Sequence, residues 1–394
     1  MTTMMNLILF VLALPATAVS LYLLLFTLLS RAPQAALRSS RRLHFDVVVP
    51  AHNEAAVIES VITSLHKLDW PSDGFRILVV ADNCTDTTAE LARAAGAEVL
   101  EHHDTRHRGK GYALDFAFQA SQAHGWAYAV VVVDADTEVS ANLLEAFAAR
   151  IELGAKVIQV HYDVLNSRAS WRTRLMTIAL ASFHRVRSRA RERLQLSCGI
   201  RGNGWCITHR LLRQVPYRAY SLAEDIEYGI DLGLAGFRVH YVDEAYVAAM
   251  MVTGEQAART QRQRWEDGRW QLIHSKTLPL LQAFMGRGGR VCLDLALDLL
   301  VLPLSYVALN VAALIVLASI ALLWEPSMEI WLWLGLGCGL GLLLYVLRGW
   351  QLSGVGWRGL VDLLRAPFFV IWKVLLMLRA RGSVEWIRTK REQS

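Results

Sequence analysis

Apolar residues along the chain fall into long uncharged runs near both ends and into short runs separated by polar stretches in the middle. The first long run, residues 5–29, carries no charged side chain and exceeds the about 20 residues that cross a bilayer. It is followed by Arg31, Arg38, Arg41 and Arg42. Because Lys and Arg are enriched on the cytoplasmic side of spanning helices, we predict a transmembrane helix over 1–30 with the following chain in the cytoplasm. A cleaved signal peptide is the alternative, but its apolar core is shorter and follows a basic residue.

Apolar composition returns after residue 290. Runs over about 299–324 and 330–347 flank a short acidic hairpin, which predicts two transmembrane helices within 290–348. The basic segment 356–394 contains a shorter apolar stretch, 366–378, interrupted by a lysine. That stretch is too short for a typical span, so we expect the C-terminal segment to be an amphipathic helix at the membrane interface. Whether 366–378 crosses the bilayer is left open.

A second basic segment lies inside the chain, over residues 165–195. It holds eight arginines among apolar side chains. The mixture is typical of an amphipathic helix on an anionic leaflet, and we expect an interfacial segment there. A solvated helix that packs against the neighbouring domain is the alternative.

Between these regions, residues 43–275 alternate short β-branched runs with helical patterns. FDVVVP, RILVVAD, AEVLEH and AYAVVVVDAD are the apolar runs, and each is separated from the next by an amphipathic stretch. Continuous apolar strands connected by helices indicate a parallel sheet that is covered on both faces. The sequence therefore predicts an α/β domain.

Polar residues gather where three of these strands end. They are His52, Asn53 and Glu54 after the first, Asp82 and Asn83 after the second, and Asp134 and Asp136 after the fourth. Ligands of such sheets bind at the carboxyl ends of the strands. The two aspartates suit a divalent cation, because Mg²⁺ usually pairs one or two carboxylates with substrate phosphates. We therefore expect a nucleotide site with a metal ion at this edge.

Composition and charge narrow the class of protein. The 54 % share of hydrophobic residues supports a membrane protein, and the net charge of +6 suits anionic lipid or a phosphate-bearing substrate. The five cysteines form no CxxC pair, which favours reduced thiols over a disulfide framework or a zinc site. No GxGxxG follows the first strand and no GxxxxGK[ST] is present, which argues against dinucleotide oxidoreductases and P-loop enzymes. The arginines show no nucleic-acid module, so nucleic acid is not expected as a partner.

Six motifs, taken in order, resemble those of the family-2 glycosyltransferases, in particular the membrane branch with cellulose, hyaluronan and poly-N-acetylglucosamine synthases. They are VVVPAHNE, VVADNCTD, RGKGYAL, VVVDADTE, SLAEDIEYGIDLGLAGF and QRQRW, and they cover about residues 45–270. The resemblance implies an α/β fold of the GT-A (Rossmann-like) type, with this domain inserted between transmembrane helices. It also implies a UDP-sugar donor, Mg²⁺ or Mn²⁺ as cofactor, and inversion at the anomeric carbon.

The resemblance also implies roles for individual residues on the donor side. Contact with the nucleotide sugar falls to Ala51, Asn53, Glu54, Asp82, Lys110 and Asp134. Among these, Asp82 matches the acid that recognises uracil, and Lys110 matches a residue near the base or phosphates. Asp136 matches the direct metal ligand. The alternative for Lys110 is a solvated lysine before a helix, with no role in donor binding.

On the acceptor side, Asp225 of the AED motif matches the general base, which takes a proton from the acceptor hydroxyl during attack. Glu224 is the alternative base, and both acids could instead be helix N-terminal charges. Gln261, Arg264 and Trp265 of QRQRW match residues at the diphosphate and acceptor. Gly202 in RGNGW matches an acceptor-side loop where the backbone approaches the glycan closely.

We therefore expect an inverting, metal-dependent glycosyltransferase that extends a cell-envelope glycan or exopolysaccharide at the cytoplasmic face of the inner membrane. Three spans are fewer than a synthase with its own export channel has, so an accessory membrane subunit or a homo-oligomer is one expectation. A single transfer to a lipid-linked acceptor is the other. A hypothesis of another class is a non-catalytic membrane scaffold with a nucleotide-binding domain.

Overall fold

The computed structural model describes residues 2–34, 38–251, 255–286 and 289–367, with the backbone alone over 255–265. The described chain divides into two compact units. One contains residues up to 31, 168–190 and 298 onward, and the other contains 32–167 and 191–297. The first unit holds the predicted membrane helices and the second holds the predicted α/β domain.

The second unit is built on one sheet of eight strands in the order β3-β2-β1-β4-β7-β6-β8-β5. Their bounds are β1 Phe45–Ala51, β2 Phe75–Asp82, β3 Glu98–His102, β4 Ala129–Val132, β5 Thr137–Val139, β6 Val157–Val164, β7 Trp205–Thr208 and β8 His240–Ala249. Strands β3, β2, β1 and β4 are parallel, as the alternating pattern predicts. Strand β7, which the pattern did not predict, is antiparallel to both β4 and β6, so the whole sheet is mixed.

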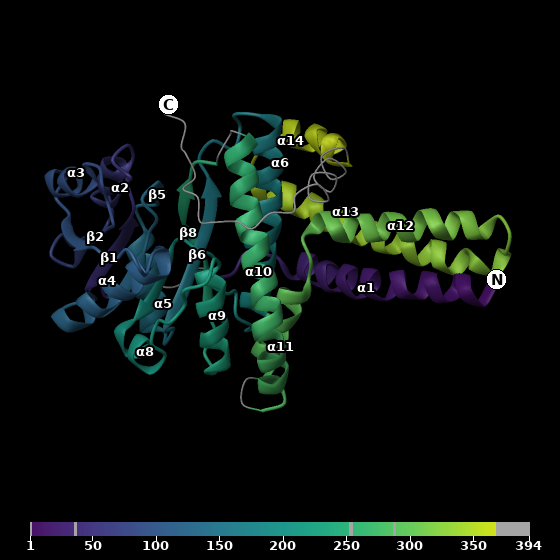
Figure 1. Cartoon of the computed structure of the whole chain (residues 1–394), viewed down its shortest axis with the longest axis horizontal. Coiled ribbons are helices and arrows are strands. Elements are labelled where there is room, and N and C mark those ends of the chain that lie inside the picture. The colour runs from purple at the N-terminus through teal and green to yellow at the C-terminus, as the bar shows by residue number, and fades with distance from the viewer. Residues whose placement is uncertain (1, 35–37, 252–254, 287–288, 368–394) are drawn as a thin grey trace. The chain divides into compact units, whose positions relative to one another are not determined.

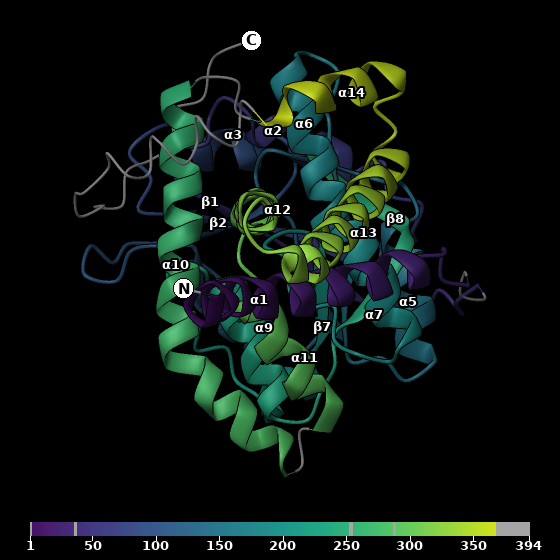
Figure 2. The same ribbon diagram turned by 90° about the vertical axis from the view of Figure 1, so that its right-hand side faces the viewer.

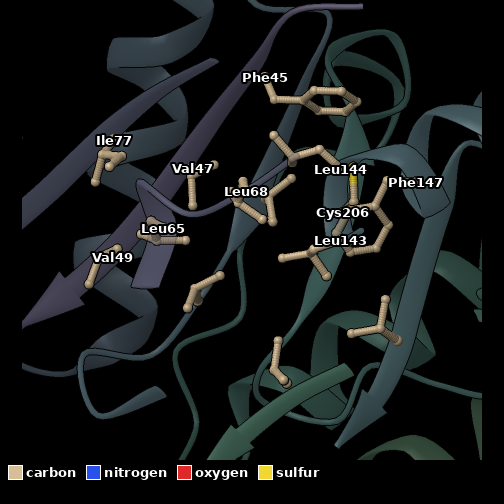
Figure 3. Packing of buried hydrophobic residues seen from close by; sticks show 14 of the residues in the cluster. Phe45, Val47, Val49, Leu65, Leu68, Ile77, Leu143, Leu144, Phe147 and Cys206 are labelled. Atoms are coloured by element: carbon tan, nitrogen blue, oxygen red, sulfur yellow. The ribbon is translucent and has the colours of Figure 1, made fainter. Parts of the chain in front are cut away.

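Helices cover both faces of this sheet. They are α2 Ile58–Leu65, α3 Thr88–Ala94, α4 Lys110–His124, α5 Leu143–Glu152, α8 His209–Gln214 and α9 Glu224–Leu234. Helices α10 Glu255–Phe284 and α11 Gly289–Leu300 pack on α9. Successive side chains of β1 point to opposite faces, so Val47 and Val49 pack with Leu65 and Phe147 while Val48 packs with Leu114. Figure 3 shows the first of these two layers. This two-sided burial explains why the strands read as continuous apolar runs.

The first unit contains three helices long and apolar enough to cross a membrane. These are α1 Thr2–Leu29, α12 Leu304–Leu322 and the stretch Pro326–Ser353, which consists of a 3₁₀ turn and α13 Glu329–Ser353. They pack along one another (Figures 1 and 2) around buried Leu9, Leu23, Leu314 and Tyr345. Their length and apolar composition suggest membrane association, and their bounds overlap the predicted spans. The unit ends in α14 Trp357–Asp362 and a 3₁₀ turn, Leu363–Arg365. The predicted interfacial stretch 366–378 lies almost entirely outside the described residues.

The arginine-rich segment forms α6 Trp171–Leu180, a π-helical stretch Ala181–Val186 and α7 Arg187–Arg193. Within the first unit this segment packs on α13. The lack of a side chain at Gly349 leaves room for Ser182, because a Cβ there would lie 1.9 Å from the Ser182 hydroxyl. The hydroxyl of Tyr345 donates to the carbonyl of Ser182 at 2.8 Å. Arg187 is buried and lies 3.0 Å from Asp298. Some of these arginines thus pair with carboxylates inside the protein, and contact of the others with a leaflet stays a prediction.

Candidate active site

Two loops at the carboxyl ends of β1 and β2 are bound to each other. Asn53, in left-handed backbone geometry, accepts a hydrogen bond from the amide of Thr85 at 2.7 Å. The amide of Glu54 donates to the hydroxyl of Thr88 at 2.8 Å. Glu54 lies before α2, which begins at Ile58, so its position in a loop leaves it near the sheet edge. The structure thus brings four predicted nucleotide residues together at the ends of neighbouring strands. Ala51 and Asp82 end β1 and β2, and Asn53 and Glu54 lie in the loop after β1.

The carboxylate of Asp82 is almost fully buried and is held by two neighbours. Its Oδ1 accepts from the side-chain amide of Asn83 at 2.8 Å and lies 2.8 Å from Nδ1 of His102. The His102 ring packs on Phe116 of α4, with ring centroids 4.7 Å apart. His102 thus contacts a predicted nucleotide-binding residue, and sequence reasoning missed this contact. Its position at the end of β3, at the same sheet edge as Asp82, was the signal that could have found it.

Lys110, the first residue of α4, reaches across to the end of β4. Its Nζ lies 2.5 Å from Oδ1 of Asp134 and donates to the carbonyl of Gly202 at 2.6 Å. Burial works against the charged lysine, but the negative charges of Asp134 and Glu224 outweigh it and raise the pKa of Lys110. The lysine is therefore charged and central to the site, and the alternative of a solvated lysine before a helix was wrong.

Glu224 and Asp225 are the first two residues of α9, and both are partly buried. Burial and the neighbouring Asp225 raise the pKa of Glu224 to about 7, and burial also raises the pKa of Asp225. Gly202 adopts a φ of 81°, and a Cβ there would lie 3.4 Å from Oδ2 of Asp225. The glycine thus leaves the space beside this carboxylate free of a side chain.

The segment before Glu224 packs closely against two glycines, one in α4 and one in α10. A Cβ on Gly111 of α4 would lie 2.3 Å from the carbonyl oxygen of Ala219. A Cβ on Gly268 of α10 would lie 3.0 Å from Cβ of Ala223. Close backbone packing therefore fixes the two acids against the helix that carries Lys110 and against α10.

Gln261, Arg264 and Trp265 fall within helix α10, but their side chains lie outside the described residues. Gly268 is on the same helix, three residues after Trp265, and packs beside the acids of α9. The backbone of the QRQRW motif is thus on the helix that borders the acids, and the roles of its side chains stay predictions.

Asp134 and Asp136 have the donor chemistry that a hard divalent cation requires. Both follow β4 and are partly exposed. Among the side chains that the structure describes, no three His, Cys, Asp or Glu residues form a metal-binding group on their own. A Mg²⁺ or Mn²⁺ ion that shares its coordination between one or two carboxylates and substrate phosphates needs no such group, so the residues present fit it.

The chain is similar to several known glycosyltransferases. The chain is 25 % identical over 264 residues to the probable glycosyltransferase YdaM of Bacillus subtilis, covering 63 % of this chain and 60 % of that protein. It is 27 % identical over 237 residues to the beta-monoglucosyldiacylglycerol synthase of Synechocystis, covering 57 % and 47 %. It is 32 % identical over 130 residues to the glycosyltransferase AglD of Haloferax volcanii, covering 32 % and 20 %. The matched part thus spans a fifth to three fifths of these relatives' lengths.

Among solved structures, the chain is similar to the mannosyltransferase PcManGT from Pyrobaculum calidifontis in complex with GDP-Man and Mn²⁺. The TM-score is 0.51 at 18 % identity, and the similarity covers 86 % of this chain and 98 % of that one. This likeness shows the GT-A-like fold of the mixed sheet, which the apolar helices precede and follow along the chain. The family described as glycosyltransferase like family 2 matches residues 42–268, and the chain belongs to that family.

Proposed function

We propose that this protein is an inverting, metal-dependent glycosyltransferase that moves a sugar from a UDP-sugar to a cell-envelope glycan or exopolysaccharide at the cytoplasmic face of the inner membrane. The convergence of Lys110, Asp134 and the Glu224–Asp225 pair carries the proposal. Lys110 contacts Asp134 directly, and the negative charges of both acids on α9 help to raise its pKa. One cation and several carboxylates at the end of a sheet suit a reaction that separates a diphosphate from a sugar.

The donor would lie along the carboxyl ends of β1, β2 and β4. Asp82, held by His102 and Asn83, would accept a hydrogen bond from the base, and Asn53 and Glu54 belong to the loop beside it. Lys110 would meet the phosphates. Asp136, with Asp134, would hold Mg²⁺ or Mn²⁺, which when bound neutralises charge on the diphosphate. The GDP-Man and Mn²⁺ bound by PcManGT support a nucleotide sugar as donor and a divalent metal as cofactor.

Asp225 would act as the general base. In the reaction, the acceptor oxygen bonds to the anomeric carbon while the bond from that carbon to the diphosphate oxygen breaks. The proton of the acceptor hydroxyl passes to the carboxylate of Asp225, and a single displacement inverts the configuration. The raised pKa of Asp225 makes it a better proton acceptor than an exposed aspartate. Gly202 keeps the approach to this carboxylate clear, and Glu224 is the alternative base.

Gln261, Arg264 and Trp265 would serve the diphosphate and acceptor. An arginine can bind two phosphate oxygens at once, and an indole can stack on a sugar ring. The packing of Gly268 against Ala223 supports placing α10 beside the base.

A second candidate function is a single transfer to a lipid-linked acceptor. Three helices among the described residues are long enough to cross a membrane, and one similar protein is a synthase of a glucosylated diacylglycerol. For polymer synthesis, an accessory membrane subunit or a homo-oligomer would complete a conduit. A non-catalytic scaffold remains the alternative of another class, and the Lys110–Asp134 contact argues against it because the site is assembled.

The test is release of UDP by the detergent-purified protein with a panel of UDP-sugars, membrane lipid extract and Mg²⁺ or Mn²⁺. We expect metal-dependent turnover of one donor, and its loss in Asp136→Asn. A long product would support polymer synthesis, and a single added sugar would support the glycolipid alternative. Binding of UDP without turnover of any donor would favour the scaffold.

A further inference from the structure

A buried amide connects the loop before β7 to the turn after β4. The side chain of Asn203 is 1 % exposed. Its Oδ1 accepts from the backbone amide of Asp134 at 3.0 Å, and its Nδ2 donates to the hydroxyl of Thr137 at 2.7 Å. Asn203 therefore binds the first residue of the Asp134–Asp136 turn and Thr137, which directly follows the turn.

Hydrogen bonds from Gln159 of β6 fix the loop that carries Asn203. Nε2 of Gln159 donates to the carbonyl of Asn203 at 2.6 Å, and Oε1 of Gln159 accepts from the amide of Arg201 at 2.9 Å. Gly204 has a φ of 69°, and a Cβ there would lie 2.6 Å from Val247. The buried network leaves little freedom to the loop.

The same loop also contacts the helix that carries the proposed base. The carbonyl of Gly202 accepts from Lys110, and the α-carbon of Gly202 faces Oδ2 of Asp225. Gly229 of α9 packs on the amide of Ile200, where a Cβ would lie 3.0 Å away. Residues 199–204 thus lie between the Asp134–Asp136 turn and the start of α9.

We infer that Asn203 is a positioning residue that fixes the Asp134–Asp136 turn in register with Asp225. The inference rests on the proposed function, in which the turn serves the donor and Asp225 serves the acceptor. An amide suits this position because it supplies one acceptor for the Asp134 amide and one donor for Thr137 on a single planar group. An aliphatic side chain offers neither, and the turn would lose both anchors.

The sharpest test changes the far end of this link and leaves Asn203 in place. Thr137→Val keeps the shape of the side chain but removes the hydroxyl, so Nδ2 of Asn203 loses its partner. Thr137→Ser keeps the hydroxyl and is the matched control. The turn then loses one of its two anchors, so we expect Thr137→Val to weaken binding of Mn²⁺·UDP about tenfold. Thr137→Ser should stay within about twofold of the wild type.

The measurements are calorimetric titration of the full-length protein with UDP and Mn²⁺, and steady-state kinetics with donor and acceptor varied separately. The inference predicts a raised KM for the donor and a lower kcat in Thr137→Val, with the KM for the acceptor unchanged and activity restored in Thr137→Ser. Asn203→Ala should be more severe, with a loss of about 10–100-fold. If Asn203→Ala does not fold, the Thr137 pair decides alone.

Equal Mn²⁺·UDP binding and kinetics in the wild type, Thr137→Val and Thr137→Ser would overturn the role of Asn203. A wild-type protein that neither binds Mn²⁺·UDP nor turns over any donor would instead contradict the proposed function. A fall in both donor and acceptor affinity, accompanied by a lower melting temperature, would assign Asn203 to general stability and would also overturn the inference.

Discussion

Nζ of Lys110 lies 2.5 Å from Oδ1 of Asp134, which joins the start of α4 to the end of β4. This contact supplies positive charge to a group of carboxylates that would otherwise repel a diphosphate. Lys110→Met should therefore lower kcat/KM for the donor by about 100-fold, since the carboxylate of Asp134 loses its cationic partner and the phosphates lose a contact. Lys110→Arg should keep part of the activity.

The matched control is Lys67→Met, which removes an exposed lysine elsewhere on the same unit. Steady-state kinetics of the three variants separate a specific effect from a change in net charge. Activity of Lys110→Met close to that of Lys67→Met would rule out the proposed role.

The partly buried pair of acids, Glu224 and Asp225, predicts a pH dependence of stability. Burial and Asp225 raise the pKa of Glu224 from 4.5 to about 7, so the folded protein holds a proton that the unfolded chain releases. Stability from this proton is fully present below about pH 4.5 and is lost as the pH rises through about 7. Glu224→Gln stays neutral and should raise the melting temperature at pH 8 by a few degrees, corresponding to roughly 1–3 kcal/mol.

At pH 5 the same variant should melt close to the wild type. Glu59→Gln, at an exposed position of α2, is the control and should have no pH-dependent effect. Thermal melts at both pH values check the sign. A Glu224→Gln variant less stable than the wild type at pH 8 would show that the folded protein stabilises the ionised form of Glu224, which contradicts a raised pKa.

His102 should affect donor affinity through Asp82. His102→Ala removes the ring that lies 2.8 Å from Asp82, so we expect UDP to bind about 5–10-fold more weakly, in line with loss of a hydrogen bond to a charged group. His103→Ala, at the exposed neighbouring position, is the matched control. Titration of both variants with UDP and Mn²⁺ measures the difference, and equal affinities would exclude His102 from the site.

Gly268 should matter for activity although alanine is the better helix former. In a helix interior, Gly→Ala usually stabilises by about 1 kcal/mol. In α10, however, the added Cβ would lie 3.0 Å from Cβ of Ala223 and 3.2 Å from its amide nitrogen, so the helix or the segment before Glu224 must move. We expect Gly268→Ala to lower kcat about tenfold or more, with a smaller change in donor affinity.

Gly337→Ala is the control for this substitution, because Gly337 lies inside helix α13 with no neighbouring atom within 4 Å of the added Cβ. Kinetics and thermal melts of both variants distinguish displacement of the base from a change in helix propensity. Full activity of Gly268→Ala would show that the position of α10 does not affect the base.

Much of the fold could be predicted because its signals are local. The parallel half of the sheet consists of apolar runs buried on both faces, and the spanning helices are long uncharged runs. The antiparallel part was missed for a physical reason. Strand β7 is only four residues long, and its direction depends on pairing with β4, which is more than 70 residues earlier in the chain. No local pattern encodes that pairing.

In the candidate site too, local patterns predicted some residues, and the contacts of others depend on how distant segments pack. Asp82, Asp134 and Asp136 could be predicted because each follows an apolar strand, and the carboxyl ends of parallel strands meet at one edge. The contact of Lys110 with Gly202 spans 92 positions, and it depends on how α4 packs beside the loop before β7. Asn203 and His102 act by hydrogen bonds to other site residues, and an isolated amide or imidazole has no distinctive sequence pattern.

The most direct test of the proposed catalysis is the rate of sugar transfer by Asp225→Asn. The asparagine keeps the shape of the side chain but cannot take the acceptor proton, so the rate should fall at least about 1,000-fold while UDP and Mn²⁺ still bind. Asp231→Asn, on the same helix and paired with Lys276, is the control and should stay near the wild-type rate. A transfer rate of Asp225→Asn within a few fold of the wild type would contradict the assignment of Asp225 as the base.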